Sequence, residues 1–202
     1  ARPDMSLSIT LASGSASRRA LLAGAGVEAA CIKPNVDEDS AKAAMRAEGM
    51  SVRDQAMQLA ELKAVKVSSR TEGLVIGGDQ MLSLDREAFD KPADLDGARD
   101  HLRKLSGKSH TLETAIVICE NGTPVWRHLA RPKLTMRPLS EAFINDYVDR
   151  VGEPLLATVG AYQLEGLGAQ LFAQIEGDYF SILGLPLLPL LDYLRIRGAL
   201  AT

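Results

Sequence analysis

Leu74-Val75-Ile76-Gly77-Gly78-Asp79 is the stretch on which the predicted fold depends. Its first three residues form a continuous apolar, largely β-branched run, which favours a buried central strand. We expect the strand to stop at the two glycines, so that Asp79 lies at the sheet edge where open α/β folds bind ligands. A carboxylate in this position is equally typical of a turn, where it stabilises the backbone. The position alone therefore leaves both interpretations of Asp79 open.

Strand and helix patterns alternate on both sides of this segment. Strands are predicted over residues 7–11 and 29–32, as a hairpin of 111–119 with 124–136, and as short glycine-containing pieces within 159–183. Helices are predicted over residues 17–25 and 51–67, and after Asp94, Ser140 and Pro186. This alternation predicts an α/β fold with a mixed β-sheet and flanking helices. No linker divides the chain, so we expect one domain over residues 1–202 with two lobes.

The bulk composition is that of a folded protein without broad attraction for polyanions. The 202 residues are 46% hydrophobic and 24% charged, and the formal net charge of −3 argues against a nucleic-acid partner. No apolar run approaches the roughly 20 residues of a membrane span and no secretory leader is recognisable, which favours the cytoplasm and no membrane contact. Cys31 and Cys119 match no zinc or redox spacing, so both are expected in the core.

Lys63 lies on the apolar stripe of the helix predicted over residues 51–67. It follows Leu59 by four residues and Ala60 by three, so all three residues share one helical face. Lysine is almost never fully buried unless its ammonium is paired. Either the side chain snorkels to water, or the ammonium is directed into a cleft that binds an anion.

The junction between the first strand and the first helix carries an unusual set of polar residues. Ser13, Ser15 and Ser17 are followed by Arg18 and Arg19. The free N–H groups and the dipole of a helix N-terminus attract phosphate, and Arg18 adds a planar fork that fits phosphate oxygens. A serine N-cap would explain one of the three serines. The segment therefore predicts an anion-binding site.

Two other lysines need a more cautious interpretation. Lys91 is held in an extended conformation by Pro92, and taken alone it is more typical of a solvated lysine. Gly107-Lys108-Ser109 resembles the end of a Walker A loop, but Leu102 occupies the required upstream glycine position and a helix, not a strand, precedes it. We therefore exclude a P-loop.

Taken together, the polar motifs resemble those of the Maf family of nucleotide pyrophosphatases, and the resemblance runs through most of the chain. The matching segments are residues 11–22 (LASGSASRRALL), 36–38 (VDE), 59–64 (LAELKA), 77–80 (GGDQ), 91–92 (KP), 105–107 (LSG), His110, 160–162 (GAY), 175–179 (IEGDY) and 184–186 (GLP). So many ordered matches are far more specific than any single motif.

The resemblance implies an elongated α/β fold with a deep cleft between two lobes, in a protein that is usually a homodimer. It also implies hydrolysis of a nucleoside triphosphate to the monophosphate and pyrophosphate with a divalent cation, Mg²⁺ or alternatively Mn²⁺ or Co²⁺. Asp79 matches the catalytic acidic position of the family, and the other polar cleft positions match Ser13, Arg18, Glu38, Lys63 and Lys91. Glu38 is the expected second carboxylate beside Asp79 for the metal.

Two positions bear on which nucleotide is hydrolysed. Gln80 and Glu165 look like the subfamily that prefers 7-methyl-GTP, whereas members acting on dTTP and UTP have Thr and Gln there. Ser17 departs from both groups, which have Trp and Arg respectively, and Ala16 replaces a usual proline. Glu165 would accept hydrogen bonds from the N1–H and amine of a guanine. A modified purine such as 7-methyl-GTP is therefore the expected substrate, with UTP and dTTP as alternatives.

A second function class stays open at this point. The Maf family is associated with control of the division septum, so a nucleotide-sensing regulator with little or no turnover is the alternative to an enzyme. Nucleotide binding without hydrolysis would distinguish this alternative. The polar residues expected of a catalytic site are all retained, which favours the enzyme.

Overall fold

The computed structural model describes residues 7–202, and the first six residues of the predicted domain lie outside this range. Strands and helices alternate in the order β1 (Ile9–Ala12), α1 (Ala16–Gly24), β2 (Ala30–Cys31), α2 (Glu38–Ala47), α3 (Val52–Ser68), β3 (Leu74–Leu84), β4 (Glu87–Phe89), α4 (Leu95–Leu105), β5 (Ser109–Glu120), β6 (Thr123–Ala130), β7 (Lys133–Met136), α5 (Glu141–Val151), two 3₁₀ turns η1 (Glu153–Ala157) and η2 (Leu167–Leu171), β8 (Phe172–Glu176), α6 (Tyr179–Ile182) and α7 (Leu187–Ile196). The predicted α/β class is confirmed.

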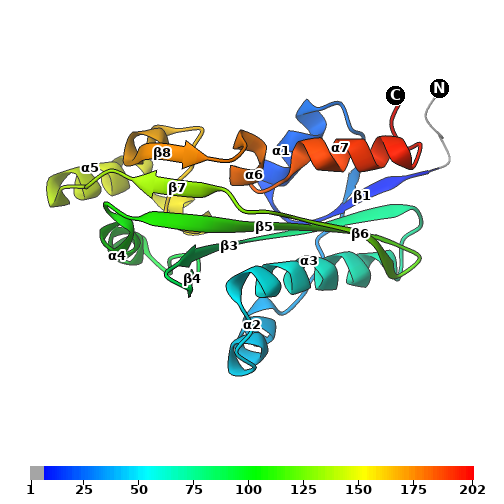
Figure 1. Ribbon diagram of the computed structural model, residues 1–202, viewed down its shortest axis with the longest axis horizontal. Helices are drawn as coiled ribbons and strands as arrows, with labels where there is room; N and C mark the ends of the chain where they lie inside the picture. Colours follow the sequence, from blue (N-terminus) through cyan, green and yellow to red (C-terminus); the bar gives the residue numbers. More distant parts are fainter. Residues whose placement is uncertain (1–6) are drawn as a thin grey trace.

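One mixed sheet of eight strands runs along the long axis of the molecule (Figure 1). The strand order is β2-β1-β3-β5-β7-β8, with β4 paired to β3 and β6 paired to β5. The β1–β2 and β1–β3 pairs are parallel, whereas the others are antiparallel. The parallel pairs need helical crossovers, which α1 and the α2–α3 segment provide, and this explains the α/β pattern in the first half of the chain.

Three buried clusters divide the molecule into two lobes. At one end, α3 packs on one face of the sheet through Leu59 and Ala60, and α1 and α7 cover the other face through Leu22 and Leu190. At the other end, α4, α5 and the 3₁₀ turns enclose a separate cluster around Tyr147. Strands β3 and β5 pass through both lobes and connect them.

Most predicted helix starts are found where the sequence placed them. Ser51, Asp94 and Ser140 each accept a hydrogen bond from the backbone N–H three residues later. Each of these side chains satisfies one of the N–H groups that a helix N-terminus leaves free. No helix within residues 7–202 is long and apolar enough to cross a membrane.

The expectation that the central strand ends at Asp79 is wrong. Strand β3 continues to Leu84, and Asp79 lies in its middle, opposite Ala115 of β5. The glycines do not end the strand because β5 pairs with it continuously from Leu74 to Ser83. Gly77 instead permits close helix packing, since a Cβ there would lie 2.3 Å from the carbonyl oxygen of Ala60 in α3.

Three smaller expectations are also wrong. The strand predicted over residues 124–136 is split at Arg131 and Pro132 into β6 and β7, because proline cannot donate a ladder hydrogen bond. The segment 159–183 holds η2 and α6 beside a single strand, β8, instead of several short strands. Cys31 is exposed, because the two-residue strand β2 lies at the sheet edge, whereas Cys119 is buried as predicted.

Gly77→Ala is expected to lower the free energy of unfolding by about 3 kcal/mol or more, the upper end of the range for overpacked cores. The added methyl meets backbone atoms of α3, namely the Ala60 oxygen and the Ala64 nitrogen at 2.7 Å, so the helix must move. Urea denaturation measures the change. Gly24→Ala is the matched control, because no atom lies within 4 Å of its added methyl. A loss below about 1 kcal/mol at Gly77 would contradict the close packing of α3 on β3.

Candidate active site

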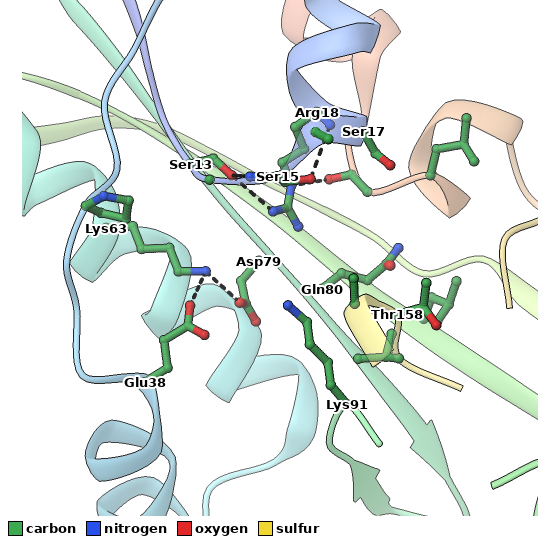
Figure 2. A pocket seen from close by; sticks show the side chains of 18 of the residues that line it. Ser13, Ser15, Ser17, Arg18, Glu38, Lys63, Asp79, Gln80, Lys91 and Thr158 are labelled. Carbon is green, nitrogen blue, oxygen red and sulfur yellow. Dashed lines mark hydrogen bonds and ion pairs between the residues drawn. The ribbon is translucent and has the colours of Figure 1, made fainter. Parts of the chain in front are cut away.

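A cavity of about 810 Å³ lies between the two lobes, lined by segments from both (Figure 2). One wall comes from residues 13–18 and 33–42 together with Lys63, and the other includes residues 157–159 and 162–165. All ten residues singled out from the sequence line it: Ser13, Ser15, Ser17, Arg18, Glu38, Lys63, Asp79, Gln80, Lys91 and Glu165. A second cavity, of about 850 Å³ at the start of α3, contains none of them.

The cavity lies where one edge of β3 is open. Strand β1 pairs with β3 only as far as Gly77, and β4 begins to pair with it at Leu82. Within the described part of the chain, no strand covers residues 78–81 on that side. Successive side chains of a strand point to opposite faces, so Asp79 faces α3 whereas Gly78 and Gln80 face α1 and α6. Groups from both faces of the sheet therefore reach one cavity.

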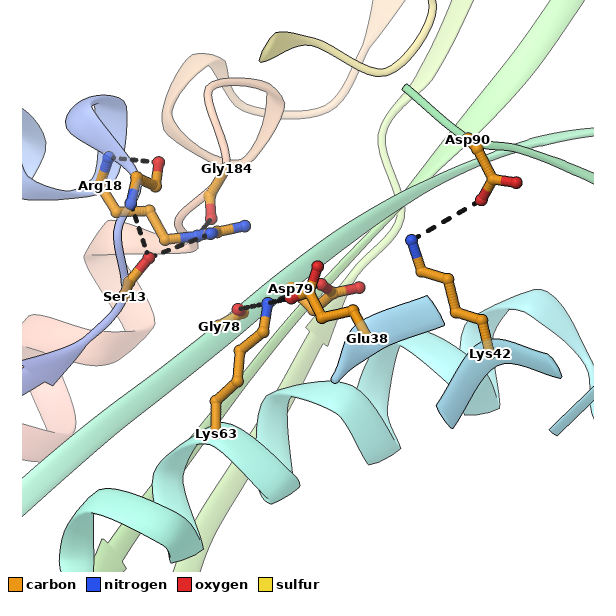
Figure 3. Close-up of polar contacts among 10 residues, drawn as sticks. Ser13, Arg18, Glu38, Lys42, Lys63, Gly78, Asp79, Asp90 and Gly184 are labelled. Atoms are coloured by element: carbon orange, nitrogen blue, oxygen red, sulfur yellow. Dashed lines mark hydrogen bonds and ion pairs between the residues drawn. The ribbon is translucent and has the colours of Figure 1, made fainter. Parts of the chain in front are cut away.

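Lys63 joins two of the carboxylates that line the cavity, those of Glu38 and Asp79 (Figure 3). Its Nζ lies 2.6 Å from Oε1 of Glu38 and 2.9 Å from Oδ1 of Asp79, and it also donates to the carbonyl oxygen of Gly78 at 3.3 Å. The side chain of Asp79 is 9% exposed and that of Lys63 is 10% exposed. The ammonium thus points into the cleft and does not snorkel to the surface, but its contacts are carboxylates, so its direct effect is to hold them in place.

Asp79 keeps one unused oxygen. Its Oδ1 accepts from Lys63, whereas Oδ2 is buried and has no hydrogen-bond partner. A buried carboxylate oxygen without a partner is costly, so such an atom is typical of a site that a ligand, proton or cation completes. Oδ2 is therefore an acceptor with free capacity at the cavity.

Glu38 is half-buried at the first turn of α2, where Asp37 is the N-cap. Burial acts to raise the pKa of Glu38, but attraction and a hydrogen bond from Lys63 act in the opposite direction, with smaller contributions from Lys42 and Lys91. The net result is a pKa below the ordinary value of 4.5. Glu38 is consequently ionised at neutral pH.

Arg18 lies on the opposite wall and is buried. Its Nε donates to the carbonyl oxygen of Gly184 at 2.7 Å, and Nη1 lies 3.4 Å from Oγ of Ser13. Burial lowers the pKa of Arg18, and the charges of Asp79 and Glu38 partly oppose that effect. Ser15 caps α1, so the start of this helix opens on the cavity beside Arg18, as Figure 2 shows.

The remaining cationic and polar positions are more open to solvent. Lys91 and Glu165 are exposed at the rim, and Ser17 is half-buried beside the helix start. Lys91 makes no ion pair within residues 7–202, so its ammonium is available to an anionic ligand. Gln80 is different, because its Nε2 is held by three acceptors: Oγ1 of Thr114 and the carbonyl oxygens of Ser181 and Ile182, at 3.0 to 3.1 Å.

The sequence did not single out several residues that line the same cavity. Lys33, Lys42, Thr158 and Gln163 also line it, as does Tyr162 of the matching motif 160–162. Lys42 is four residues after Glu38, and this helical spacing is the one signal that could have indicated it. Lys33, Thr158 and Gln163 lie outside regular helices and strands, where no periodicity reports which way a side chain points.

A buried polar network supports the wall that contains Tyr162. The Tyr162 hydroxyl lies 2.8 Å from Nε2 of His110, and the hydroxyl of Tyr147 donates to the carbonyl oxygen of Ala161 at 3.0 Å. Burial lowers the pKa of His110 to about 4, so the ring is neutral at physiological pH. His110, which belongs to one of the matching motifs, therefore lies behind the cavity wall and not within it.

Comparison with known proteins assigns the chain to a family. Residues 8–197 match the family model described as Maf-like protein, so the chain belongs to this family. It is 74% identical over 198 residues to a protein of Hyphomonas neptunium named nucleoside triphosphate pyrophosphatase, an alignment that covers 98% of this chain and all of the relative. The resemblance seen in the sequence motifs is confirmed.

Two further relatives differ from each other in the substrate that their names state. A protein of Rhodospirillum rubrum, named nucleoside triphosphate pyrophosphatase, is 54% identical over 95% of this chain and 96% of its own length. A protein of Mesorhizobium japonicum, named 7-methyl-GTP pyrophosphatase, is 50% identical over 97% of this chain and 99% of its own length. The relatives thus agree on the class of reaction and differ in the nucleotide named.

Lys63→Met should raise the pKa of Glu38, because it removes the neighbouring ammonium and leaves burial as the dominant influence. Carbon-13 NMR titration of the Glu38 carboxyl measures this pKa directly. In the wild-type protein, the lowered pKa stabilises the fold at neutral pH, and this contribution is lost as the pH falls through the folded-state pKa. The variant should therefore lose less stability on acidification.

Lys66→Met is the control for this substitution, since Lys66 lies on the same helix but is exposed and contacts the carbonyl oxygen of Asn35. It should leave the titration of Glu38 unchanged. An unaltered Glu38 pKa in Lys63→Met would show that the contact between Lys63 and Glu38 does not control the ionisation of this carboxylate.

Proposed function

We propose that this protein hydrolyses the α–β phosphoanhydride of a nucleoside triphosphate, giving the nucleoside monophosphate and pyrophosphate. The observation that carries the proposal is the free Oδ2 of buried Asp79, whose other oxygen is fixed by Lys63. The names of the relatives support the same reaction. The chain is accordingly a hydrolase that acts on acid anhydrides.

A triphosphate brings nearly four negative charges into the cavity, and attack at the α-phosphorus concentrates charge on its oxygens. Arg18, Lys91 and the N-terminus of α1 are placed to neutralise this charge. The serines Ser13, Ser15 and Ser17 lie beside them and offer hydroxyl groups to phosphate oxygens. Because Arg18 is buried, its interaction with a phosphate is screened less than that of a surface arginine.

Asp79 acts in this scheme as the general base. Its Oδ2 accepts a proton from water as the water oxygen attacks the α-phosphorus, and the bond to the bridging oxygen breaks so that pyrophosphate leaves. Lys63 orients the carboxylate, since it donates to the other oxygen. Glu38 contacts the same ammonium through its Oε1, beside Asp79.

Nucleotide pyrophosphatases of this family generally use a divalent cation. Among the described residues, no group of three or more His, Cys, Asp or Glu side chains could hold a metal by itself. The unpartnered Oδ2 of Asp79 and the carboxylate of Glu38 nevertheless suit Mg²⁺, which prefers one or two carboxylates with phosphate oxygens and water. We propose that these residues hold Mg²⁺, or Mn²⁺ or Co²⁺, which would neutralise phosphate charge when bound.

The preference for one nucleotide over another should depend on two hydrogen-bond acceptors, from Gln80 and Glu165, that face the nucleobase of the substrate. Two carbonyl oxygens fix Nε2 of Gln80, so its Oε1 is the amide atom available to the cavity. Glu165 at the rim adds a carboxylate. Guanine presents two neighbouring donors, N1–H and an amine, whereas uracil and thymine present one donor between two acceptors. We therefore propose a guanine nucleotide, with 7-methyl-GTP the first candidate, although Ser17 lacks an aromatic ring to stack on the base.

The proposal also covers the cellular location, the oligomeric state and the partners of the protein. We propose that it works in the cytoplasm as a homodimer on a small-molecule nucleotide, without nucleic acid or membrane partners. The net charge of −3 gives no broad attraction for a polyanion, and Arg18, Lys63 and Lys91 supply positive charge locally in the cavity.

A panel of triphosphates tests the proposed reaction. With Mg²⁺, Mn²⁺ or Co²⁺ present, the wild-type protein should release pyrophosphate from at least one of 7-methyl-GTP, GTP, UTP and dTTP. Asp79→Asn, which keeps the shape of the side chain, should lower the rate by about 100-fold or more and thereby exclude a contaminating enzyme. Addition of EDTA should abolish turnover. Tight nucleotide binding without pyrophosphate release would favour the regulatory alternative.

Glu165→Gln should shift the ranking of substrates from purines towards pyrimidines. The change replaces a double acceptor by an amide that can also donate to the carbonyl oxygens of uracil or thymine. The measurement is kcat/KM for 7-methyl-GTP, GTP, UTP and dTTP side by side. Glu153→Gln, an exposed glutamate outside the cavity, is the control. An unchanged ranking would remove Glu165 from substrate selection.

A further inference from the structure

Thr114 is a buried polar residue that neither the sequence motifs nor the cavity lining singles out. It lies on β5, is 0% exposed, and does not line the cavity. Its Oγ1 donates to the carbonyl oxygen of Ser181 at 3.1 Å, and accepts from Nε2 of Gln80 at 3.0 Å. A hydroxyl that is fully buried and engaged in both directions is part of a built polar network.

The network fastens the end of α6 and the turn that follows it to the sheet. Gln80 also donates to the carbonyl oxygens of Ser181 and Ile182, at 3.1 and 3.0 Å. Thr114 and Gln80 come from neighbouring strands, opposite each other in the register of β3 and β5. Together they hold the segment from Ser181 to Gly184 against the face of the sheet that lies away from α3.

Gly184, in the turn that follows α6, holds the guanidinium of Arg18. The carbonyl oxygen of Gly184 accepts from Nε of Arg18 at 2.7 Å (Figure 3). Gly184 has φ +114°, a conformation that favours glycine, and its missing Cβ would lie 3.6 Å from Arg18. Gly78 bounds the guanidinium on the other side, where an added Cβ would lie 3.0 Å from Nε. The Arg18 side chain therefore lies between Gly78 of β3 and Gly184, the residue that accepts its hydrogen bond.

We propose that Thr114 and Gln80 are positioning residues for Arg18, acting through the segment from Ser181 to Gly184. They fix the Gly184 carbonyl, which fixes the plane of the guanidinium and the direction in which it meets phosphate. This inference rests on the proposed role of Arg18 in binding phosphate. The proposal also gives the Gln80 amide a second role beside nucleobase selection. Its Nε2 has no remaining hydrogen to donate to a substrate and serves to hold Ser181 and Ile182.

A double-mutant cycle tests the coupling between Thr114 and Arg18. Thr114→Val keeps the shape of the side chain and removes the hydroxyl, whereas Arg18→Lys keeps the charge and loses the planar fork. The probe is inorganic tripolyphosphate with Mg²⁺, titrated calorimetrically, so that neither a base nor turnover enters the measurement. Thr114→Val should weaken binding about tenfold in the wild-type background, as expected for the loss of about one hydrogen bond. The same change should weaken binding less than twofold in the Arg18→Lys background.

Two controls separate positioning from general damage. Thr111→Val removes a hydroxyl from the same strand on the opposite face and should leave affinity unchanged. Thr114→Ser retains the hydroxyl and should restore affinity, with thermal unfolding confirming that each variant is folded. Equal losses in the two Arg18 backgrounds would overturn the proposal. So would a Thr114→Val effect confined to the relative rates on GTP and UTP, which would indicate contact with the base.

The outcome is independent of the proposed reaction. Tripolyphosphate binding with the expected coupling, combined with no pyrophosphate release from any nucleotide, would reject the reaction and leave the positioning role standing. Additive effects in an active enzyme would reject the positioning role alone. Failure of the wild-type protein to bind tripolyphosphate would overturn the role of Arg18 and, with it, the role of Thr114.

Discussion

The ammonium of Lys63 between Glu38 and Asp79 is the interaction on which the rest of the site depends. The ammonium holds the two carboxylates beside each other, because it lies 2.6 Å from Oε1 of Glu38 and 2.9 Å from Oδ1 of Asp79. The lysine is held by the packing of α3 on β3, which brings the helix against Gly77. Loss of the lysine would leave buried charge uncompensated, a far larger cost than the loss of a surface ion pair. Helix packing and chemistry are thus linked through one side chain.

Much of the site was predictable because its residues violate local rules. A lysine on an apolar stripe and three serines at one helix start are unusual for residues with a purely structural role, and a carboxylate after two glycines fits a ligand site as well as a turn. All lie around the same cavity. The resemblance to the Maf family then supplied the roles, which spacing alone left open. The helix starts at Ser51, Asp94 and Ser140 were predictable for a local reason, since capping involves residues only three positions apart.

What the sequence could not predict depends on pairing between distant segments. Asp79 was expected at the end of a strand, yet β5 extends β3 beyond it and the site forms at a gap between β1 and β4. Whether a strand has a neighbour on a given side is a property of the whole sheet, and no local pattern carries it. Thr114 escaped notice for the same reason, because its partners Ser181 and Gln80 are 67 and 34 residues away.

The alternation of side chains along β3 has a consequence for how such enzymes can diverge. Asp79 points to the face covered by α3, and the next residue, Gln80, points to the face covered by α6. The proposed general base and a residue proposed to help choose the nucleotide are therefore adjacent in sequence but have separate packing environments. A substitution at position 80 would leave the ion pair at position 79 in place, but it would remove the hydrogen bonds from Gln80 to Ser181 and Ile182. On the proposals made above, a change of selectivity at this position is therefore tied to a change in how Arg18 is held.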